Sequence, residues 1–344
     1  MDLPTVSGHK TAQNAVDRDG TEGQPDEERG VQVNGATMTR LGYAAMNRTL
    51  REEDLRMNRG MQKATFEDRG LSYAGELALS NCRGLRRVLR WNIANDVDFF
   101  RIPSSLLPWF SRYAIEELPN GEAVREALAE AGAIAREHGI RVTFHPDHFV
   151  KLASPKPDVV KRSKTDLENH GTLCDVMGLD RSPYNSINIH IGAHYGDKDA
   201  TARRFCENFQ ALPASVRSRL TVENDDTASL WSVPELAEEV HTEIGIPVVY
   251  DELHHQFTHR GLTRKEALAR ATGTWEDSDV CPIIHYSESR RLHESDPSLR
   301  PQAHSDYIAG PIRTWGSGAD VMIEAKAKER ALLAYYRSGE IENR

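Results

Sequence analysis

The stretch PVVYDELHH, residues 247–255, decides the fold that we expect for this chain. Residues 248–250 form a short run of β-branched and aromatic side chains behind turn-forming residues, which is typical of a buried strand. The run ends in an acid and two histidines, where the strand is expected to pass into a loop. Asp251 and His254 therefore offer a carboxylate oxygen and an imidazole nitrogen, which zinc and other divalent transition ions accept as ligands.

Outward from this stretch, strands and helices alternate along the chain. Seven further runs are predicted to be strands: 39–43, 99–102, 140–144, 187–191, 220–222, 282–284 and 321–323. Helical apolar spacing separates or follows most of them, at 72–97, 121–138, 157–177, 201–212, 233–244, 264–271 and 326–336. This alternation indicates an α/β protein with a single (β/α)8 barrel, the TIM barrel.

The first 37 residues differ from the rest in composition. They carry three basic and seven acidic side chains and almost no large apolar ones, so burial cannot offset their ordering entropy. We therefore predict a disordered polar tail at 1–37 and a barrel domain at 38–340. The formal net charge of −9 gives no sign of a nucleic-acid partner, which would need a local basic patch.

The cysteines and the hydropathy indicate an intracellular, soluble protein, in the cytoplasm or nucleoid, or in the nucleus of a eukaryote. The cysteines stand far apart with no CxxC pair, so neither a disulfide framework nor a thiolate zinc site is expected. No apolar run approaches the length of a membrane span, and the N-terminus has no hydrophobic signal core.

Six strand ends carry side chains that bind metals. Active sites of barrels gather at the carboxyl ends of the strands, and side chains alternate between the two faces. This alternation directs one group from each of the six strands into the same mouth: His145, His190, Glu223, Asp251, His285 and Glu324. Residues of the opposite parity, such as Ile189 and Val222, are apolar and are expected to pack against helices.

Several acids and imidazoles in one poorly solvated mouth repel and desolvate one another unless a cation is bound. Histidine and carboxylate ligands without thiolates favour zinc or manganese in a catalytic site. Glu223 lies centrally and could bridge ions about 3.5 to 4 Å apart, a spacing suited to phosphodiester hydrolysis. A metal-dependent sugar isomerase or epimerase would carry similar side chains and remains an alternative.

The motifs together resemble one known family. They are RLGY at 40–43, FRI at 100–102, HPDHF at 145–149, HIG at 190–192, LTVENDD at 220–226, YDELHH at 250–255, IHYSE at 284–288 and IEAKAKE at 323–329. The chain resembles the ultraviolet damage endonucleases over essentially its whole ordered length. The resemblance implies a TIM barrel related to endonuclease IV and to xylose isomerase-like barrels. It also implies a manganese-preferring enzyme that cuts DNA 5′ to cyclobutane dimers, 6-4 photoproducts and some abasic sites.

The resemblance also implies the residues of the site. The metal ligands would be His145, His190, Glu223, Asp251, His254, His285, His304 and Glu324. Catalysis would depend on Glu223, His285 and Glu324, with two or three divalent ions, Mn2+ in the first place and Zn2+ or Mg2+ as alternatives.

Further positions are expected to contact the substrate. Tyr43 and Asn47 match positions that face the lesion in the family. His148 and Phe149 match the pair that probes the base stack, and Phe149 can enter the stack as a wedge. A basic run follows, and Lys161 and Arg162 are expected to hold phosphates. The expected partner is damaged double-stranded DNA, with no membrane and no obligate protein partner.

The chain departs from the family at three places. His148 replaces the usual glutamine, Ser104 and Ser105 stand where some members have a histidine, and Ile283 stands where some have a lysine. The missing histidine leaves a second alternative, a protein that binds lesions without cutting.

Overall fold

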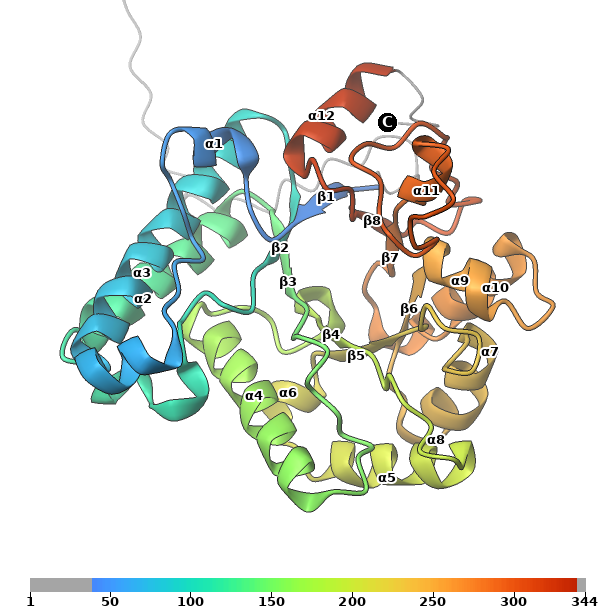
Figure 1. Ribbon diagram of the computed structural model, residues 1–344, viewed down its shortest axis with the longest axis horizontal. Helices are drawn as coiled ribbons and strands as arrows, with labels where there is room; N and C mark the ends of the chain where they lie inside the picture. Colours follow the sequence, from blue (N-terminus) through green and yellow to red (C-terminus); the bar gives the residue numbers. More distant parts are fainter. Residues whose placement is uncertain (1–38, 339–344) are drawn as a thin grey trace, which may run out of the picture. The chain divides into compact units, whose positions relative to one another are not determined.

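The computed structural model describes residues 39–338, and within them eight parallel strands close into a barrel in chain order (Figure 1). The predicted TIM barrel is therefore confirmed. The strands are β1 (Leu41–Ala44), β2 (Phe99–Ile102), β3 (Arg141–Phe144), β4 (Ile187–Ile189), β5 (Leu220–Glu223), β6 (Val248–Asp251), β7 (Ile283–Tyr286) and β8 (Asp320–Ile323). The tail predicted at 1–37 lies outside the described residues.

Helices surround the barrel (Figure 1). The longer ones are α2 (Lys63–Ala94), α3 (Gly121–Glu137), α4 (Pro157–Val176), α5 (Lys198–Gln210), α10 (Arg264–Gly273) and α12 (Glu329–Ser338). The shorter ones are α1 (Arg48–Glu52), α6 (Ala214–Arg217), α7 (Val233–Leu236), α8 (Thr242–Ile244), α9 (Glu252–Thr258) and α11 (Arg290–His293). A π-helical turn, η4 (Ala237–His241), joins α7 to α8, and 3-10 turns occur at η1 (Phe110–Arg112), η2 (Ile115–Glu117), η3 (Pro183–Asn185) and η5 (Glu276–Ser278).

Several helices differ from the predicted ones in their bounds, and α1, α6 and α11 were not predicted. Helix α2 begins at Lys63, before the predicted start at 72, and its backbone leaves the helical range at Gly70 with φ 61°. The strand β6 passes directly into helix α9 and not into a loop, because Oδ1 of Asp251 accepts the backbone N–H of His254 at 2.7 Å. Asp251 thus serves as the N-cap of α9.

The two faces of the strands form separate apolar clusters. Val249, Met322 and Phe99 belong to a small cluster with side chains of the barrel interior. Ile189 and Val222, of the opposite parity, belong to the large cluster between the strands and the helices, as predicted. The alternation that packs the helices therefore also directs the polar strand ends inward.

A buried ion pair closes the floor of the barrel. Arg141 and Asp320 are the first residues of β3 and β8, and Nη1 of Arg141 donates to Oδ2 of Asp320 at 2.8 Å with neither side chain exposed. The guanidinium also donates to the carbonyls of Tyr184 and Cys281. These charges are paired and hydrogen-bonded, so their burial is tolerated. The open end of the barrel is the opposite one.

The four cysteines carry free thiols, three of them buried and Cys281 half-buried. No disulfide is formed, as predicted. Among residues 39–338, no helix combines the length and the apolar character needed to cross a bilayer.

Candidate metal centre

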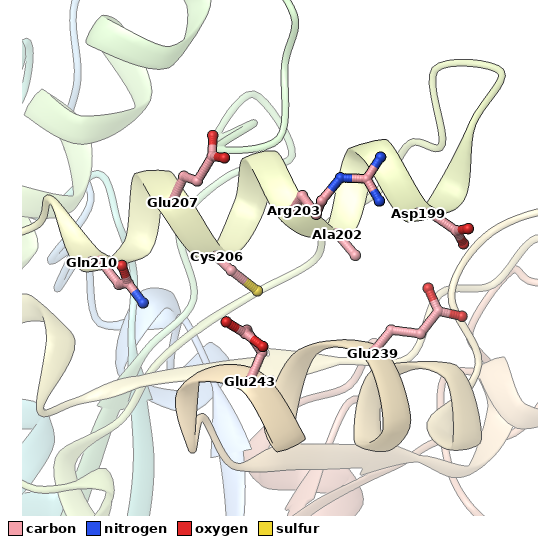
Figure 2. A pocket seen from close by; sticks show the side chains of 8 residues that line it. All are labelled: Asp199, Ala202, Arg203, Cys206, Glu207, Gln210, Glu239 and Glu243. Atoms are coloured by element: carbon pink, nitrogen blue, oxygen red, sulfur yellow. The ribbon is translucent and has the colours of Figure 1, made fainter.

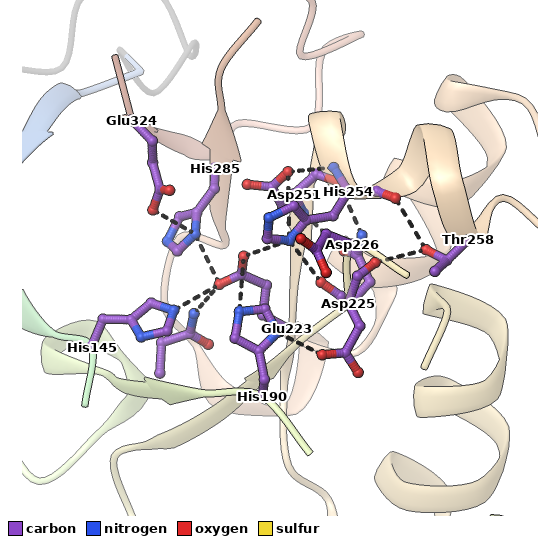
Figure 3. A network of polar contacts seen from close by, with 12 residues as sticks. His145, His190, Glu223, Asp225, Asp226, Asp251, His254, Thr258, His285 and Glu324 are labelled. Atoms are coloured by element: carbon purple, nitrogen blue, oxygen red, sulfur yellow. Dashed lines mark hydrogen bonds and ion pairs between the residues drawn. The ribbon is translucent and has the colours of Figure 1, made fainter. Parts of the chain in front are cut away.

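The carboxyl ends of the strands bring most of the predicted ligands together (Figure 3). Seven of the eight form three groups, in each of which the potential ligand atoms lie within 4.8 Å of one another. The groups are His145, Glu223 and His285; His190, Glu223 and His254; and Asp251, His285 and Glu324. Two residues, Glu223 and His285, are shared between groups.

Glu223 lies at the centre of the cluster, with its two oxygens facing different histidines. Oε1 lies 3.6 Å from Nε2 of His190 and 3.2 Å from Nδ1 of His254. Oε2 lies 3.2 Å from Nε2 of His145 and 2.9 Å from Nδ1 of His285. A carboxylate placed in this way can give one oxygen to each of two ions, so Glu223 has the geometry of a bridging ligand.

The third group shares His285 with the first. Nδ1 of His285 lies 2.9 Å from Oε2 of Glu223 and 3.3 Å from Oε1 of Glu324. One ring nitrogen has one lone pair to give, so His285 can ligate a single ion through Nδ1. The arrangement therefore holds two complete groups around Glu223 and a third that competes for His285.

Unpaired polar atoms test whether a cation fits this cluster. Oδ2 of Asp251 is buried without a hydrogen-bond partner, and Nδ1 of His285, although close to Oε2 of Glu223 and Oε1 of Glu324, forms a hydrogen bond with neither. Buried polar atoms are nearly always paired, and an ion is one of the partners that can satisfy them. The donors present, imidazoles and carboxylates without thiolate, suit a catalytic divalent site. The residues thus fit a metal ion.

The pKa values of Glu223 and Asp251 are shifted in opposite directions. Burial acts to raise the pKa of Glu223, but His285 and His190 outweigh it and hold that pKa well below its usual value. Burial raises the pKa of Asp251 above its usual value although His254 opposes it. The surrounding protein groups therefore stabilise the charged form of Glu223 but not that of Asp251.

Neighbouring polar groups fix the orientation of the ligands. Nδ1 of His190 lies 3.2 Å from Oδ1 of Asp225, and Asn188 donates its Nδ2 to Oε2 of Glu223. The hydroxyl of Ser104 donates to the backbone carbonyl of His145 at 2.8 Å. Such partners hold a ligating ring in one orientation and tune its basicity. Ser104, one of the two serines expected where some members have a histidine, thus supports the site through the backbone.

Arg101 is a site residue that the sequence analysis did not name. Its Nη1 forms an ion pair with Oε1 of Glu324, and both side chains are mostly buried. Burial acts to raise the pKa of Glu324, but Arg101 and then His285 outweigh it and lower that pKa. The signal was present in the sequence, because Arg101 has the same parity as Phe99 on β2 and so faces the barrel interior.

His304, the eighth predicted ligand, comes from the segment between β7 and β8. Its Nδ1 lies 2.9 Å from the backbone oxygen of Glu324 and 3.7 Å from Oε2 of the same residue. It lies beside the cluster but belongs to none of the three groups.

The predicted DNA-contacting residues divide into two sets. Phe149, at the tip of the β3–α4 loop, is 75% exposed, and its ring lies 4.0 Å from that of His148 between centroids. Lys161 and Arg162 lie exposed near the start of α4. Phe149, Lys161 and Arg162 also line a cavity of about 680 Å3 between α4 and the segment 104–112. This set lies together on the surface.

Tyr43 and Asn47, which are expected to face the lesion, are both buried in this structure. Tyr43 is fully buried, and its hydroxyl donates to Oδ1 of Asn92 on α2 at 2.7 Å and accepts from Nδ2 of Asn47 at 3.0 Å. Asn47 is buried as well and caps α1 by accepting the N–H of Leu50. Tyr43 has the outward parity of β1, so it packs against a helix. Both side chains form hydrogen bonds inside the protein here, and their contact with a lesion stays a prediction.

A second hollow lies between α5 and the turn η4–α8 (Figure 2). One cation, Arg203, and four carboxylates line it: Asp199, Glu207, Glu239 and Glu243. Its residues contribute no histidine, and carboxylates repel phosphates, so this face is unsuited to a DNA backbone.

Fold and site together define a (β/α)8 barrel with a cluster of imidazoles and carboxylates, able to bind metal, at its mouth. Comparison with known proteins specifies the family. The model of the UV-endonuclease UvdE family matches residues 39–343, and the chain belongs to this family.

Individual relatives support membership of the same family. The UV DNA damage endonuclease of Halalkalibacterium halodurans is 32% identical over 303 residues, which cover 85% of this chain and 91% of the relative. The UV-damage endonuclease of Neurospora crassa is 31% identical over 307 residues, which cover 83% of this chain and 44% of that longer relative. The crystal structure of SacUVDE matches with a TM-score of 0.74 and 28% identity, covering 88% of this chain and 100% of that one. A 3-keto-D-glucoside 4-epimerase from E. coli, 11% identical with a TM-score of 0.50, shares the fold alone.

Proposed function

We propose that this protein is a metal-dependent DNA repair endonuclease that nicks the phosphodiester 5′ to ultraviolet photoproducts, including cyclobutane dimers and 6-4 photoproducts, and at some abasic sites. The observation that carries the proposal is the position of Glu223, whose two oxygens face two separate histidine pairs. Relatives that carry the UV DNA damage endonuclease name support the substrate class.

The proposed ligands are the residues of the three groups together with His304, holding two or three ions, Mn2+ in the first place. Bound divalent ions lower the pKa of an attacking water and stabilise the charge on the leaving oxygen. Glu223 keeps the two histidine pairs at a fixed separation. Asp225 orients His190, and Arg101 holds Glu324 in its charged form beside His285.

Recognition of the lesion is proposed to depend on how easily the damaged DNA is deformed, and not on its base sequence. A photoproduct stacks poorly, so extruding it costs less than the few kcal/mol of an intact step. Phe149 is exposed at the mouth and can fill the gap that the lesion leaves. Lys161 and Arg162 lie behind it and hold the phosphate backbone.

The test is a nicking assay with the pure protein, manganese and a labelled duplex that bears one photoproduct. We expect a single nick on the 5′ side of the lesion, none in the undamaged duplex, and loss of nicking after chelation. Turnover of a small polyol without any effect on DNA would establish a sugar isomerase or epimerase instead. A gel shift without a nick would establish a lesion-binding protein. Repeating the assay with Zn2+ and Mg2+ identifies the preferred ion.

Phe149→Ala tests the wedge. We expect this variant to keep its binding to undamaged duplex and to lose most of the nicking of the damaged one. If Phe149→Ala nicks damaged duplex as well as the parent protein does, the role of Phe149 as a wedge is refuted.

A further inference from the structure

Tyr195 is an exposed aromatic residue in a strained conformation at the barrel mouth. It lies in the loop between β4 and α5, five residues after His190, and is 41% exposed. Its backbone has φ 47°, in the left-handed region that costs a residue with a Cβ roughly 1 kcal/mol. A residue with strained backbone and an exposed side chain is a candidate for a functional role.

The loop of Tyr195 is fastened to the loop that carries Phe149. Nζ of Lys151 donates to the carbonyl of Gly192 at 3.3 Å. Nε of Arg204, on α5, donates to the carbonyl of Ala153 at 2.9 Å, and its guanidinium carbon lies 5.6 Å from the centroid of the Tyr195 ring. The position of the Tyr195 ring is therefore fixed relative to the β3–α4 loop.

The surroundings of the ring suit a nucleobase. Lys151 and Arg204 bring two cations to the joined loops, which favours a phosphate-linked ligand. Tyr195 is the single large apolar side chain of its stretch of the loop, whose neighbouring residues 193, 194, 196 and 197 are small or polar, so this stretch offers no continuous apolar patch. A protein partner would need such a patch, whereas one base needs a single ring beside a cation.

We propose that Tyr195 is a second base-stacking residue, whose ring stacks on a nucleobase of the bound duplex next to the place that Phe149 enters. This inference rests on the proposed endonuclease function. Stacking tolerates any base, so Tyr195 holds the duplex in register with the metal centre without reading its sequence.

The first experiment compares nicking kinetics and thermal stability for Tyr195→Gly, Tyr195→Phe and the parent holoenzyme. Glycine accepts a φ of 47° without strain, so Tyr195→Gly is expected to melt at or above the parent temperature. We expect its KM for damaged duplex to rise about tenfold with kcat nearly unchanged, since loss of one stacked base removes uniform binding. Tyr195→Phe keeps a ring and is expected to keep the parent KM.

The matched control is Tyr73→Ala on α2, where Arg69 lies over the ring of Tyr73 at 3.3 Å to the centroid. This change removes a similar arginine–tyrosine pair from an outer helix and is expected to leave KM unchanged. Duplexes with the fluorescent base 2-aminopurine placed in turn on each side of the lesion then locate the stacked base. At that position we expect the parent protein to quench the fluorescence of 2-aminopurine and Tyr195→Gly to lose this quenching.

The outcomes distinguish failure of the stacking role of Tyr195 from failure of the proposed endonuclease function. A Tyr195→Gly enzyme with the parent KM and parent quenching would overturn the stacking role and leave the endonuclease intact. A Tyr195→Phe enzyme as impaired as Tyr195→Gly would overturn it as well. A parent protein that does not nick damaged duplex would instead refute the proposed function itself.

Discussion

Glu223 shows how much of the site depends on one side chain. The change Glu223→Gln keeps its size but replaces one oxygen with an N–H donor, so one histidine pair loses its shared carboxylate. We expect the variant to bind fewer manganese ions, counted by native mass spectrometry, and to nick at least about a hundredfold more slowly. Glu243→Gln, in the acidic hollow behind α5, is the control and should change neither quantity. A Glu223→Gln protein with full metal content would contradict the bridging role.

Lys328 gives a prediction for stability against pH. Burial, and then repulsion from Arg101, lower its pKa to about 8. Between about pH 8 and pH 10 the unfolded state binds this proton and the folded state does not, so stability rises with pH. At neutral pH Lys328 is charged in both states and the folded state bears the full penalty.

The change Lys328→Met removes that penalty. Urea unfolding is expected to show the variant more stable than the parent at neutral pH, with the difference shrinking towards about pH 10. Lys326→Met, which removes an exposed lysine two positions earlier, should give little difference at either pH. An advantage of Lys328→Met that grows with pH would have the wrong sign for this explanation.

At the scale of elements, β1 and β2 pair closely enough to require a glycine. A Cβ on Gly42 would lie 2.4 Å from the backbone oxygen of Phe99, and backbone cannot move aside cheaply. We expect Gly42→Ala to lower the free energy of unfolding by about 3 kcal/mol. Gly273→Ala, at the end of α10 with nothing within 4 Å of the added Cβ, should lose nothing and serves as the control. Chemical denaturation of both variants measures the difference.

The same scale shows what the sequence could predict. Strands were found because a buried parallel strand has a local signature, a short apolar run whose parity also places His145 and Asp251 inward. Helix α9 was missed because its N-cap is Asp251, which looked like a ligand only. The burial of Tyr43 was not predicted, because a matching motif does not reveal on which face of β1 a residue lies in this chain. Arg101 was missed because an arginine is not a metal ligand and its partner Glu324 is 223 positions away.

At the scale of the whole molecule, charge is distributed unevenly over the described surface. The hollow beside α5 is lined by four carboxylates, whereas the start of α4 presents Lys161 and Arg162 next to exposed Phe149. A net charge of −9 therefore does not exclude DNA, because the field that a phosphate meets is local. The acidic hollow instead disfavours binding of DNA to that side.

This distribution predicts a salt dependence. Reversing both charges, Lys161→Glu with Arg162→Glu, should weaken binding to all duplex sequences alike, since phosphate contacts carry no sequence information. The slope of log affinity against log salt concentration should become shallower by about two units if each side chain neutralises one phosphate. The control with the same change in net charge is Arg83→Glu with Arg87→Glu, on the exposed side of α2, which should leave the slope close to the parent value. Binding isotherms over a range of salt concentrations measure the slope, and an unchanged slope in the first variant would remove Lys161 and Arg162 from the DNA footprint.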